Sequence, residues 1–167
     1  MAQHPKRETV DLSQYPDLVM IYLGMQVNAL TGVKTLLGFG PKISAAVNAR
    51  PDGLLLHESF LFSPRHVGMR QYWRDYESLE AWSRSDPHRQ WWQKFIRDTG
   101  GTGFWHEMYL RRGGVEAVYV GMPSPVGLGR FAPVVPARGP MFTARKRAGI
   151  GGDSTAPEGL SERDLYR

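Results

Sequence analysis

Residues 18–27 read LVMIYLGMQV, and they form the first strand of the fold that the sequence predicts. Nearly every side chain in this stretch is apolar, which is typical of a strand that is covered on both faces. After it, apolar residues recur at helical spacing over 33–48, so we expect a helix there. Gly38, Gly40 and Pro41 predict that this helix is kinked or divided in two.

Extended and helical patterns continue to alternate after a turn at 50–53. In chain order, the further elements that we expect are strands at 54–62 and 66–74, helices at 76–84 and 87–98, and strands at 104–111 and 115–120. The order is β-α-β-β-α-β with one extra strand, which predicts an α+β, ferredoxin-like split βαβ fold with an antiparallel sheet. Since the helices cover only one face of this sheet, we expect a homodimer to cover the other.

Composition divides the chain into three expected parts. Residues 1–17 are polar and predict an N-terminal arm, residues 18–136 predict the folded domain, and residues 137–167 predict a basic, flexible tail. Gly and Pro account for 14 of the 47 residues in 121–167 but only 15 of the 103 in 18–120, which places the end of the compact region near Gly121. Because 138–167 has few large apolar residues, we expect the fold to tolerate its removal.

Charge and composition exclude several classes of protein. The net charge is +5, but residues 130–147 hold five basic and no acidic residues, and the rest of the chain is balanced. A neutral body predicts no nucleic-acid partner. The lack of cysteine excludes disulfides, zinc–cysteine sites and cysteine nucleophiles. No apolar run approaches the ~18–20 residues that cross a bilayer, and residues 1–15 show no signal peptide, so we expect a cytoplasmic protein without a membrane partner. No metal-binding or phosphate-binding motif is present.

Two histidines and one tryptophan stand out on the predicted strands. His57 and His106 lie among apolar neighbours, where each is either a hydrogen-bonded packing residue or a neutral imidazole that moves a proton. Trp73, which shares its strand face with Gln71, either fills the core or lines a cavity for a flat ligand. His88 lies in the first turn of a predicted helix, either as a surface residue or as an axial haem ligand.

Five segments of the chain carry a resemblance to a known family. They are Gly24–Asn28 (GMQVN), Gln71–Arg74 (QYWR), Pro87-His88-Arg89 with Trp92 and Phe95, Gly103–Tyr109 (GFWHEMY), and Glu116–Tyr119 (EAVY) leading to Met122-Pro123. Together they resemble the monooxygenase-like family typified by the polyketide monooxygenase of fumagillin biosynthesis, over about residues 18–136. That family belongs to the dimeric α+β barrel superfamily, with antibiotic-biosynthesis monooxygenases, haem-degrading monooxygenases and haem-containing aldoxime dehydratases.

The resemblance implies a dimeric α+β barrel in which each half holds a pocket between its sheet and its helices. Cofactor-free members oxidise electron-rich aromatic or polyene substrates with O2, using a Trp, an Asn and polar groups. Trp73 matches that tryptophan, whereas the position four before it, often polar in the family, is Met69 here. Haem-degrading members ligate iron with a histidine of the second helix, for which His88 is an approximate match.

The leading hypothesis is a monooxygenase-like enzyme that needs no cofactor and acts with O2 on a small, largely apolar or aromatic biosynthetic intermediate. The residues expected to carry this activity are Trp73 and Tyr72 to hold the substrate, His57 or His106 to move a proton, and Gln71 or Asn28 to orient oxygen or an enolate. Two alternatives stay open. One is a haem enzyme, either an aldoxime-dehydratase-like lyase or a haem-using oxygenase, with iron on His88. The other is a non-catalytic dimer that binds a small molecule.

Overall fold

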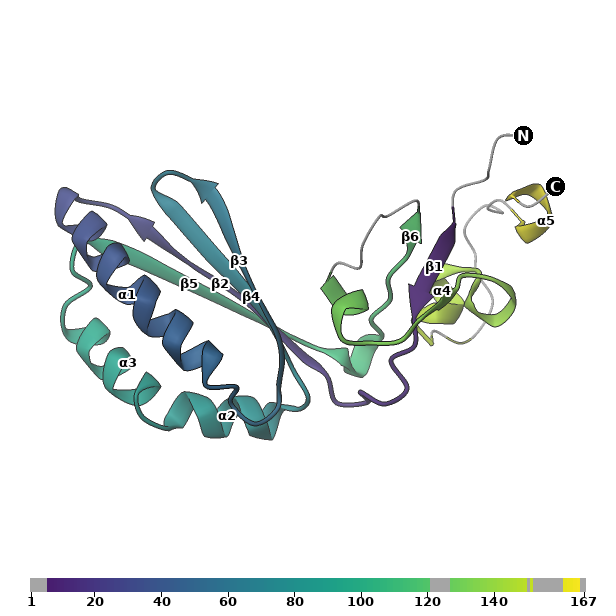
Figure 1. Cartoon of the computed structure of the whole chain (residues 1–167), viewed down its shortest axis with the longest axis horizontal. Coiled ribbons are helices and arrows are strands. Elements are labelled where there is room, and N and C mark those ends of the chain that lie inside the picture. Colours follow the sequence, from purple (N-terminus) through teal and green to yellow (C-terminus); the bar gives the residue numbers. More distant parts are fainter. Residues whose placement is uncertain (1–5, 121–126, 150, 152–160, 166–167) are drawn as a thin grey trace. The chain divides into compact units, whose positions relative to one another are not determined.

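The chain forms two compact units (Figure 1). The computed structural model describes residues 6–120, 127–149, 151 and 161–165. One unit consists of residues 17–110 and is called here the sheet–helix unit. The other combines residues 1–16 with 111–167 and is called the terminal unit. Met122 and Pro123, which carry part of the family resemblance, lie outside the described residues, as do parts of the expected arm and tail.

The sheet–helix unit confirms the predicted α+β class and element order. Its elements are β2 (Val19–Val27), α1 (Leu30–Asn48), β3 (Leu54–Ser63), β4 (His66–Trp73), α2 (Tyr76–Arg84), α3 (His88–Arg97) and β5 (Thr102–Leu110). The strands form one sheet in the order β3-β4-β2-β5, and every neighbouring pair is antiparallel. This is the split βαβ arrangement that the sequence predicts.

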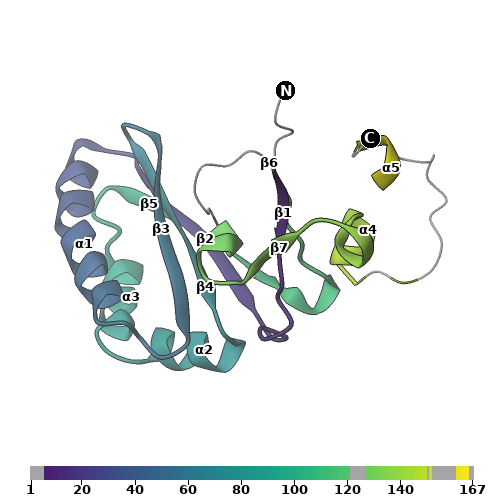
Figure 2. The same ribbon diagram turned by 45° about the vertical axis from the view of Figure 1, so that its right-hand side comes forward.

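The three helices of this unit lie on one face of its sheet (Figures 1 and 2). A buried cluster of Val19, Ile21, Trp73 and Leu79 joins the sheet to α2. Farther along the sheet, Phe104 of β5 contacts aromatic rings of α3. We call this side the helix-covered face. The opposite side, which no helix of this unit covers, is called the open face.

The register of the strands decides which side chains share the helix-covered face. Ile21 lies opposite Gln71 of β4, and Gln71 lies opposite His57 of β3. Leu23 lies between His106 of β5 and Met69 of β4. Since side chains alternate between the faces of a strand, all of these residues point to the same side.

Helix α1 is one continuous helix, so the expected division near Gly38 and Pro41 is wrong. A proline in a helix interior costs about 3 kcal/mol, and packing of the inner helix face offsets this cost in a 19-residue helix. The helix also begins three residues earlier than expected. Gly32 lies so close to the Gly101 carbonyl that a Cβ atom would come within 2.3 Å of that oxygen.

The terminal unit is built from both ends of the chain, which differs from the expected division into arm, domain and tail. Its sheet has the order β6-β1-β7, with the elements β1 (Arg7–Val10), β6 (Tyr119–Val120) and β7 (Val134–Pro136). Thus the expected arm supplies the central strand. The expected strand at 115–120 shrinks to β6. Two short helices follow, α4 (Ala144–Arg147) and α5 (Glu162–Leu165).

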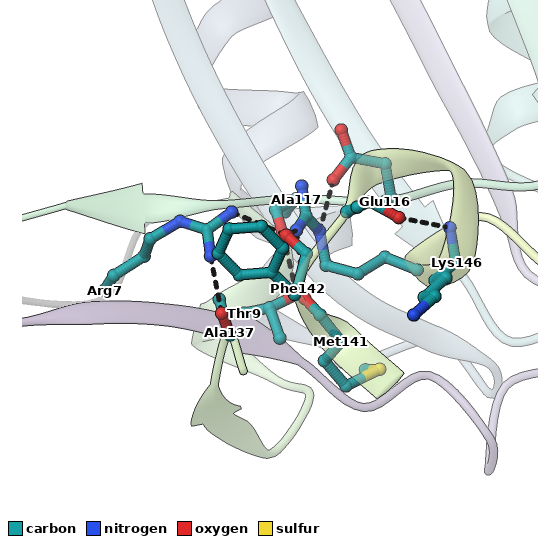
Figure 3. A network of polar contacts seen from close by, with 10 residues as sticks. Arg7, Thr9, Glu116, Ala117, Ala137, Met141, Phe142 and Lys146 are labelled. Carbon is teal, nitrogen blue, oxygen red and sulfur yellow. Dashed lines mark hydrogen bonds and ion pairs between the residues drawn. The ribbon is translucent and has the colours of Figure 1, made fainter. Parts of the chain in front are cut away.

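Backbone carbonyls hold the expected tail onto β1 (Figure 3). The Arg7 guanidinium donates to the carbonyl oxygens of Ala137 at 2.5 Å and Phe142 at 2.7 Å. The side chain of Thr9 donates to the Ala117 carbonyl at 2.7 Å. Ala137 and Phe142 are themselves buried. Residues 137–149 therefore pack as part of a folded unit, because the expectation of a flexible tail considered only their own sparse apolar residues.

Candidate functional site

Three of the predicted site residues form a hydrogen-bonded chain on the helix-covered face. Trp73 Nε1 lies 3.1 Å from Gln71 Oε1, and Gln71 Nε2 lies 3.1 Å from His57 Nδ1. Gln71 and Trp73 are buried, and His57 is half-buried. The chain thus links a core tryptophan to a histidine near the edge of the sheet.

The chemistry of Trp73 sets the direction of these hydrogen bonds. An indole N–H can only donate, so the Gln71 carbonyl oxygen accepts and the Gln71 amide donates to Nδ1 of His57. The other ring nitrogen of His57, Nε2, then carries the hydrogen and donates to Ser59 Oγ at 3.1 Å. Burial lowers the pKa of His57, although the nearby Glu58 carboxylate opposes this shift. His57 is therefore a neutral imidazole with a fixed tautomer.

His106 lies on the same face, on β5. His106 is an exposed residue, but partial desolvation of its ring lowers its pKa, and the positive charge that His88 can carry lowers it further. Within the described part of the chain, no group makes a hydrogen bond to the His106 ring. A neutral imidazole without a partner keeps one nitrogen free to accept a proton. Of the two predicted histidines, His106 is therefore the one whose ring has a nitrogen free to accept a proton.

His88 begins α3 and faces the same interior. Its Nδ1 lies 2.8 Å from the Ser83 carbonyl oxygen, so Nδ1 carries a hydrogen, and in the neutral form of the ring Nε2 holds the lone pair. The rings of Trp82 and Trp91 flank it, with centroids 4.6 Å and 6.4 Å from the centroid of His88. This is the orientation in which a histidine ligates a metal through Nε2. The sequence predicted correctly that His88 lies in the first turn of a helix, but it gave no sign that Ser83 is its hydrogen-bond partner.

Strand β2 separates the polar groups of the site. The β4 and β5 strands on its two sides are about 10 Å apart, given the usual spacing of neighbouring strands. Leu23 and Met69 lie between His106 and the hydrogen-bonded chain. The face thus offers a base on one side, an amide on the other, and apolar side chains between them. This arrangement suits an apolar molecule with one acidic group.

Two predicted site residues lie elsewhere. Tyr72 follows Gln71 directly, so the alternation of the strand sends its side chain to the open face, where it lies beside the Arg70 guanidinium. Tyr72 therefore does not share a site with Trp73. Asn28 is exposed just after the end of β2, beside Gly103. It lies five residues beyond Leu23, or about 16 Å along the strand direction.

The terminal unit contains a cavity that the sequence did not predict. Its volume is about 150 Å³, and its lining includes Arg111, Glu116 and Arg147. The Arg147 side chain, which is only 4% exposed, binds the Glu116 carboxylate at 2.7 Å. Arg111 donates to the carbonyl oxygens of Leu12 and Tyr15. About 100 residues separate the segments that form this cavity, so no local pattern could indicate it.

Over the described residues, no three His, Asp or Glu side chains gather as ligands for a metal ion. None of the helices in that part of the chain combines the length and hydrophobicity needed to cross a bilayer.

The antiparallel sheet with helices on one face makes this an α+β protein, and its helix-covered face carries the histidines of the candidate site. The profile of the Monooxygenase af470-like family matches residues 18–128, so the chain belongs to that family. No protein of curated function matches the chain in sequence.

Solved structures of aldoxime dehydratases share the fold. One superposes with a TM-score of 0.66 and 21% identity, covering 90% of this chain and 46% of its own. A second, OxdRE in complex with butyraldoxime, has a TM-score of 0.65 and 24% identity, covering 87% and 43%. The chain thus spans about half the length of these enzymes. SnoaB, a cofactor-independent oxygenase from Streptomyces nogalater, matches at a TM-score of 0.41 and 12% identity, covering 56% of this chain and 91% of its own.

Proposed function

We propose that the protein is an oxygenase that acts with O2 on a small, largely apolar substrate bound over the helix-covered face. The observation that carries this proposal is the chain from Trp73 through Gln71 to His57 on the same face as the unpaired His106. Family membership supports the reaction class. The apolar side chains of Leu23 and Met69 support the substrate class.

In the proposed reaction, His106 removes a proton from an activated C–H or O–H group of the substrate. The resulting electron-rich anion reduces O2 directly, and one oxygen atom enters the product while the other leaves as water. For a methylene group the balance is CH2 plus O2 to C=O plus H2O. Gln71 accepts from Trp73 and donates one amide hydrogen to His57, and it thereby holds the His57 ring in place beside the substrate.

The test measures O2 uptake by the purified chain with a panel of electron-rich phenols and polyketide-like aromatics. We expect His106→Gln to lower kcat about 10²–10⁴-fold, because glutamine cannot accept a proton near neutral pH. His66→Gln is the matched control, since His66 lies on β4 and bonds Trp105 across the open face. Full activity of folded His106→Gln would refute the assignment. Substrate binding without product in air would instead support a non-catalytic binding protein.

A second candidate is a haem enzyme, and the geometry of His88 favours it specifically. Ser83 fixes the ring so that Nε2 can ligate, and the aromatic side chains of Trp82 and Trp91 suit a flat ligand. A bound haem would supply redox-active iron. The role of the chain would be to hold the imidazole and to exclude water. The fold shared with aldoxime dehydratases supports this candidate.

The haem candidate is tested by colour. Hemin titrated into the protein would produce a Soret band that His88→Ala abolishes and His66→Gln preserves. A protein that stays colourless with excess hemin would eliminate haem and leave the cofactor-free reaction.

We also propose that two copies pair through their open faces. Aromatic side chains cover this face, with Tyr22 at the centre and Phe60, Phe62 and Trp105 around it. Phe62 remains 45% exposed in the single chain. A sheet face rich in aromatic side chains is stable when a second layer covers it. A second copy would also bring the assembly near the length of the aldoxime dehydratases.

A further inference from the structure

Charge is distributed unevenly within the sheet–helix unit. Helices α1 and α3 together carry five basic residues and no acidic one. The other residues of 17–110 carry nine acidic and five basic side chains. The helical layer is therefore positive, while the remainder of the unit is negative.

Most of the helical cations have no acidic partner. Arg89 pairs with Asp86, which lies two residues before the start of α3. For the other four (Lys34, Lys42, Lys94 and Arg97) the described residues provide no ion pair, and all four are exposed. By contrast, Arg70, Arg74 and Arg84, which lie outside these two helices, are paired. Unpaired, solvated cations create a field that attracts anions.

Large apolar side chains protrude from the same two helices. Leu30 is 92% exposed and Leu37 is 71% exposed on α1, and Ile96 is 65% exposed on α3. Leu30, Lys34 and Leu37 recur at helical spacing, so they share the outward face of α1. The inward face is formed by residues such as Gly32, which is buried.

The two helices form one surface. They lie side by side over the sheet in both views (Figures 1 and 2), and the rings of Phe39 and Trp91 join them at 6.1 Å. We call the surface formed by exposed side chains of these two helices, namely Leu30, Lys34, Leu37, Lys42, Lys94, Ile96 and Arg97, the basic helical surface. With 19 residues, α1 alone is about 28 Å long.

We propose that the basic helical surface docks reversibly on an anionic lipid surface. Leucine and isoleucine side chains that protrude among lysines and arginines are the pattern of interfacial helices, which insert apolar groups below the headgroups and place cations beside lipid phosphates. Each Lys or Arg near such a surface adds to the attraction. Protruding side chains suit a deformable lipid layer, whereas a partner helix requires a groove to lie in.

This inference does not rest on the proposed function, because vesicle binding needs no substrate. It differs from a membrane span, which the described helices cannot form. If the proposed function also holds, docking would bring the enzyme to the place where small apolar substrates partition.

The experiment measures co-sedimentation of the full chain with two kinds of vesicle. We expect binding to vesicles of phosphatidylcholine with phosphatidylglycerol and little binding to phosphatidylcholine alone. Raising the salt from about 0.1 M to about 1 M shortens the Debye length from about 10 Å to about 3 Å, so binding should weaken strongly. We expect Lys34→Glu with Lys42→Glu, and separately Leu30→Gln with Leu37→Gln, to reduce binding at least about tenfold.

Two controls separate this surface from other sites. Leu61→Gln removes an equally protruding leucine, 72% exposed on β3 in the sheet layer, and should bind like the parent chain. Lys146→Glu removes a cation of α4 in the basic segment 130–147, and it should also bind normally. Melting temperatures establish that each variant is folded.

Three results would overturn the proposal. The first is no binding to anionic vesicles at low salt. The second is unchanged binding by the folded Lys34→Glu, Lys42→Glu chain, or loss of binding in Lys146→Glu. The third is binding of a synthetic acidic amphipathic peptide, sensitive to the same variants, without vesicle binding, which would assign the surface to a protein partner.

Discussion

Gln71 decides how the polar groups of the candidate site are arranged. It accepts from Trp73 and donates to His57 while being only 2% exposed. Gln71→Leu would leave the buried Trp73 Nε1 and the half-buried His57 Nδ1 without partners, and a buried polar atom without a partner costs about 1–3 kcal/mol. We therefore expect this change to lower the free energy of unfolding by about 2 kcal/mol or more in urea titrations. Gln26→Leu, at an exposed position of β2, should change it little, and equal effects of the two substitutions would contradict the hydrogen-bonded chain.

The two neutral histidines predict how stability depends on pH. Burial lowers the pKa of His57 and of His106 in the folded state, so the unfolded chain binds more protons below the ordinary histidine pKa of about 6.5. Stability is then fully present above pH 6.5 and is lost as the pH falls toward the folded pKa values. We expect the free energy of unfolding to decrease from pH 7 to pH 5. Replacing both histidines by glutamine should flatten this slope, and a slope that survives the double substitution would assign it to other groups.

The candidate site was predictable from sequence only in part. Sequence patterns predicted the strands that carry His57, Gln71, Trp73 and His106. The alternation of side chains in the sheet places all four on one face. A bulge between Leu54 and Leu56 shifts the register of β3. These two leucines therefore lie on different faces of the sheet, although strict alternation would place both on the same face. The alternation of side chains read from the sequence of one strand cannot reveal such an extra residue. Nor could sequence show that none of the described groups bonds to the His106 ring, since that depends on every neighbouring element.

At the scale of the elements, long periodic segments were predicted well and short strands poorly. The β2 strand and α2 match their expected ranges within one residue. The β1 strand, with four residues including Arg7 and Glu8, was expected to be part of an arm. Its pairing with β6 and β7 brings together segments more than 100 residues apart. Such contacts leave no local pattern in the sequence.

Gly24 on β2 allows the Trp105 ring to lie close to the sheet. A Cβ atom at Gly24 would stand 2.6 Å from Trp105 Nε1, the atom that donates to His66 at 2.8 Å. Gly24→Ala must displace this ring, and overpacking of this kind costs about 1–3 kcal/mol. Gly38→Ala is the matched control, because nothing lies within 4 Å of that position in α1. We expect it to stabilise the chain by up to about 1 kcal/mol through helix propensity. Urea unfolding curves measure both, and a neutral Gly24→Ala would contradict the close packing of Trp105.

At the scale of the whole molecule, the terminal unit depends on residues after Pro136. A chain that ends at Pro136 loses buried Phe142 and the carbonyls that bind Arg7. Loss of a buried phenylalanine costs about 3–5 kcal/mol, so we expect the β1 amides to lose protection from hydrogen exchange. A chain that ends at Gly149 keeps these contacts and should retain the protection. Unchanged exchange in the shorter chain would restore the expectation that this segment is dispensable.

Pairing through the open face is also a property of the whole molecule. If this face is the interface, a charge placed on it must be buried on association without a partner, which is strongly unfavourable. We expect the parent chain to be a dimer by light scattering at micromolar concentration and Phe62→Glu to be a folded monomer. Leu61→Glu is the matched control, because the adjacent side chain is also exposed but lies on the helix-covered face. A monomeric parent chain would refute the pairing. Dissociation by Leu61→Glu instead of Phe62→Glu would move the interface to the other face, and the open face would then need a different cover.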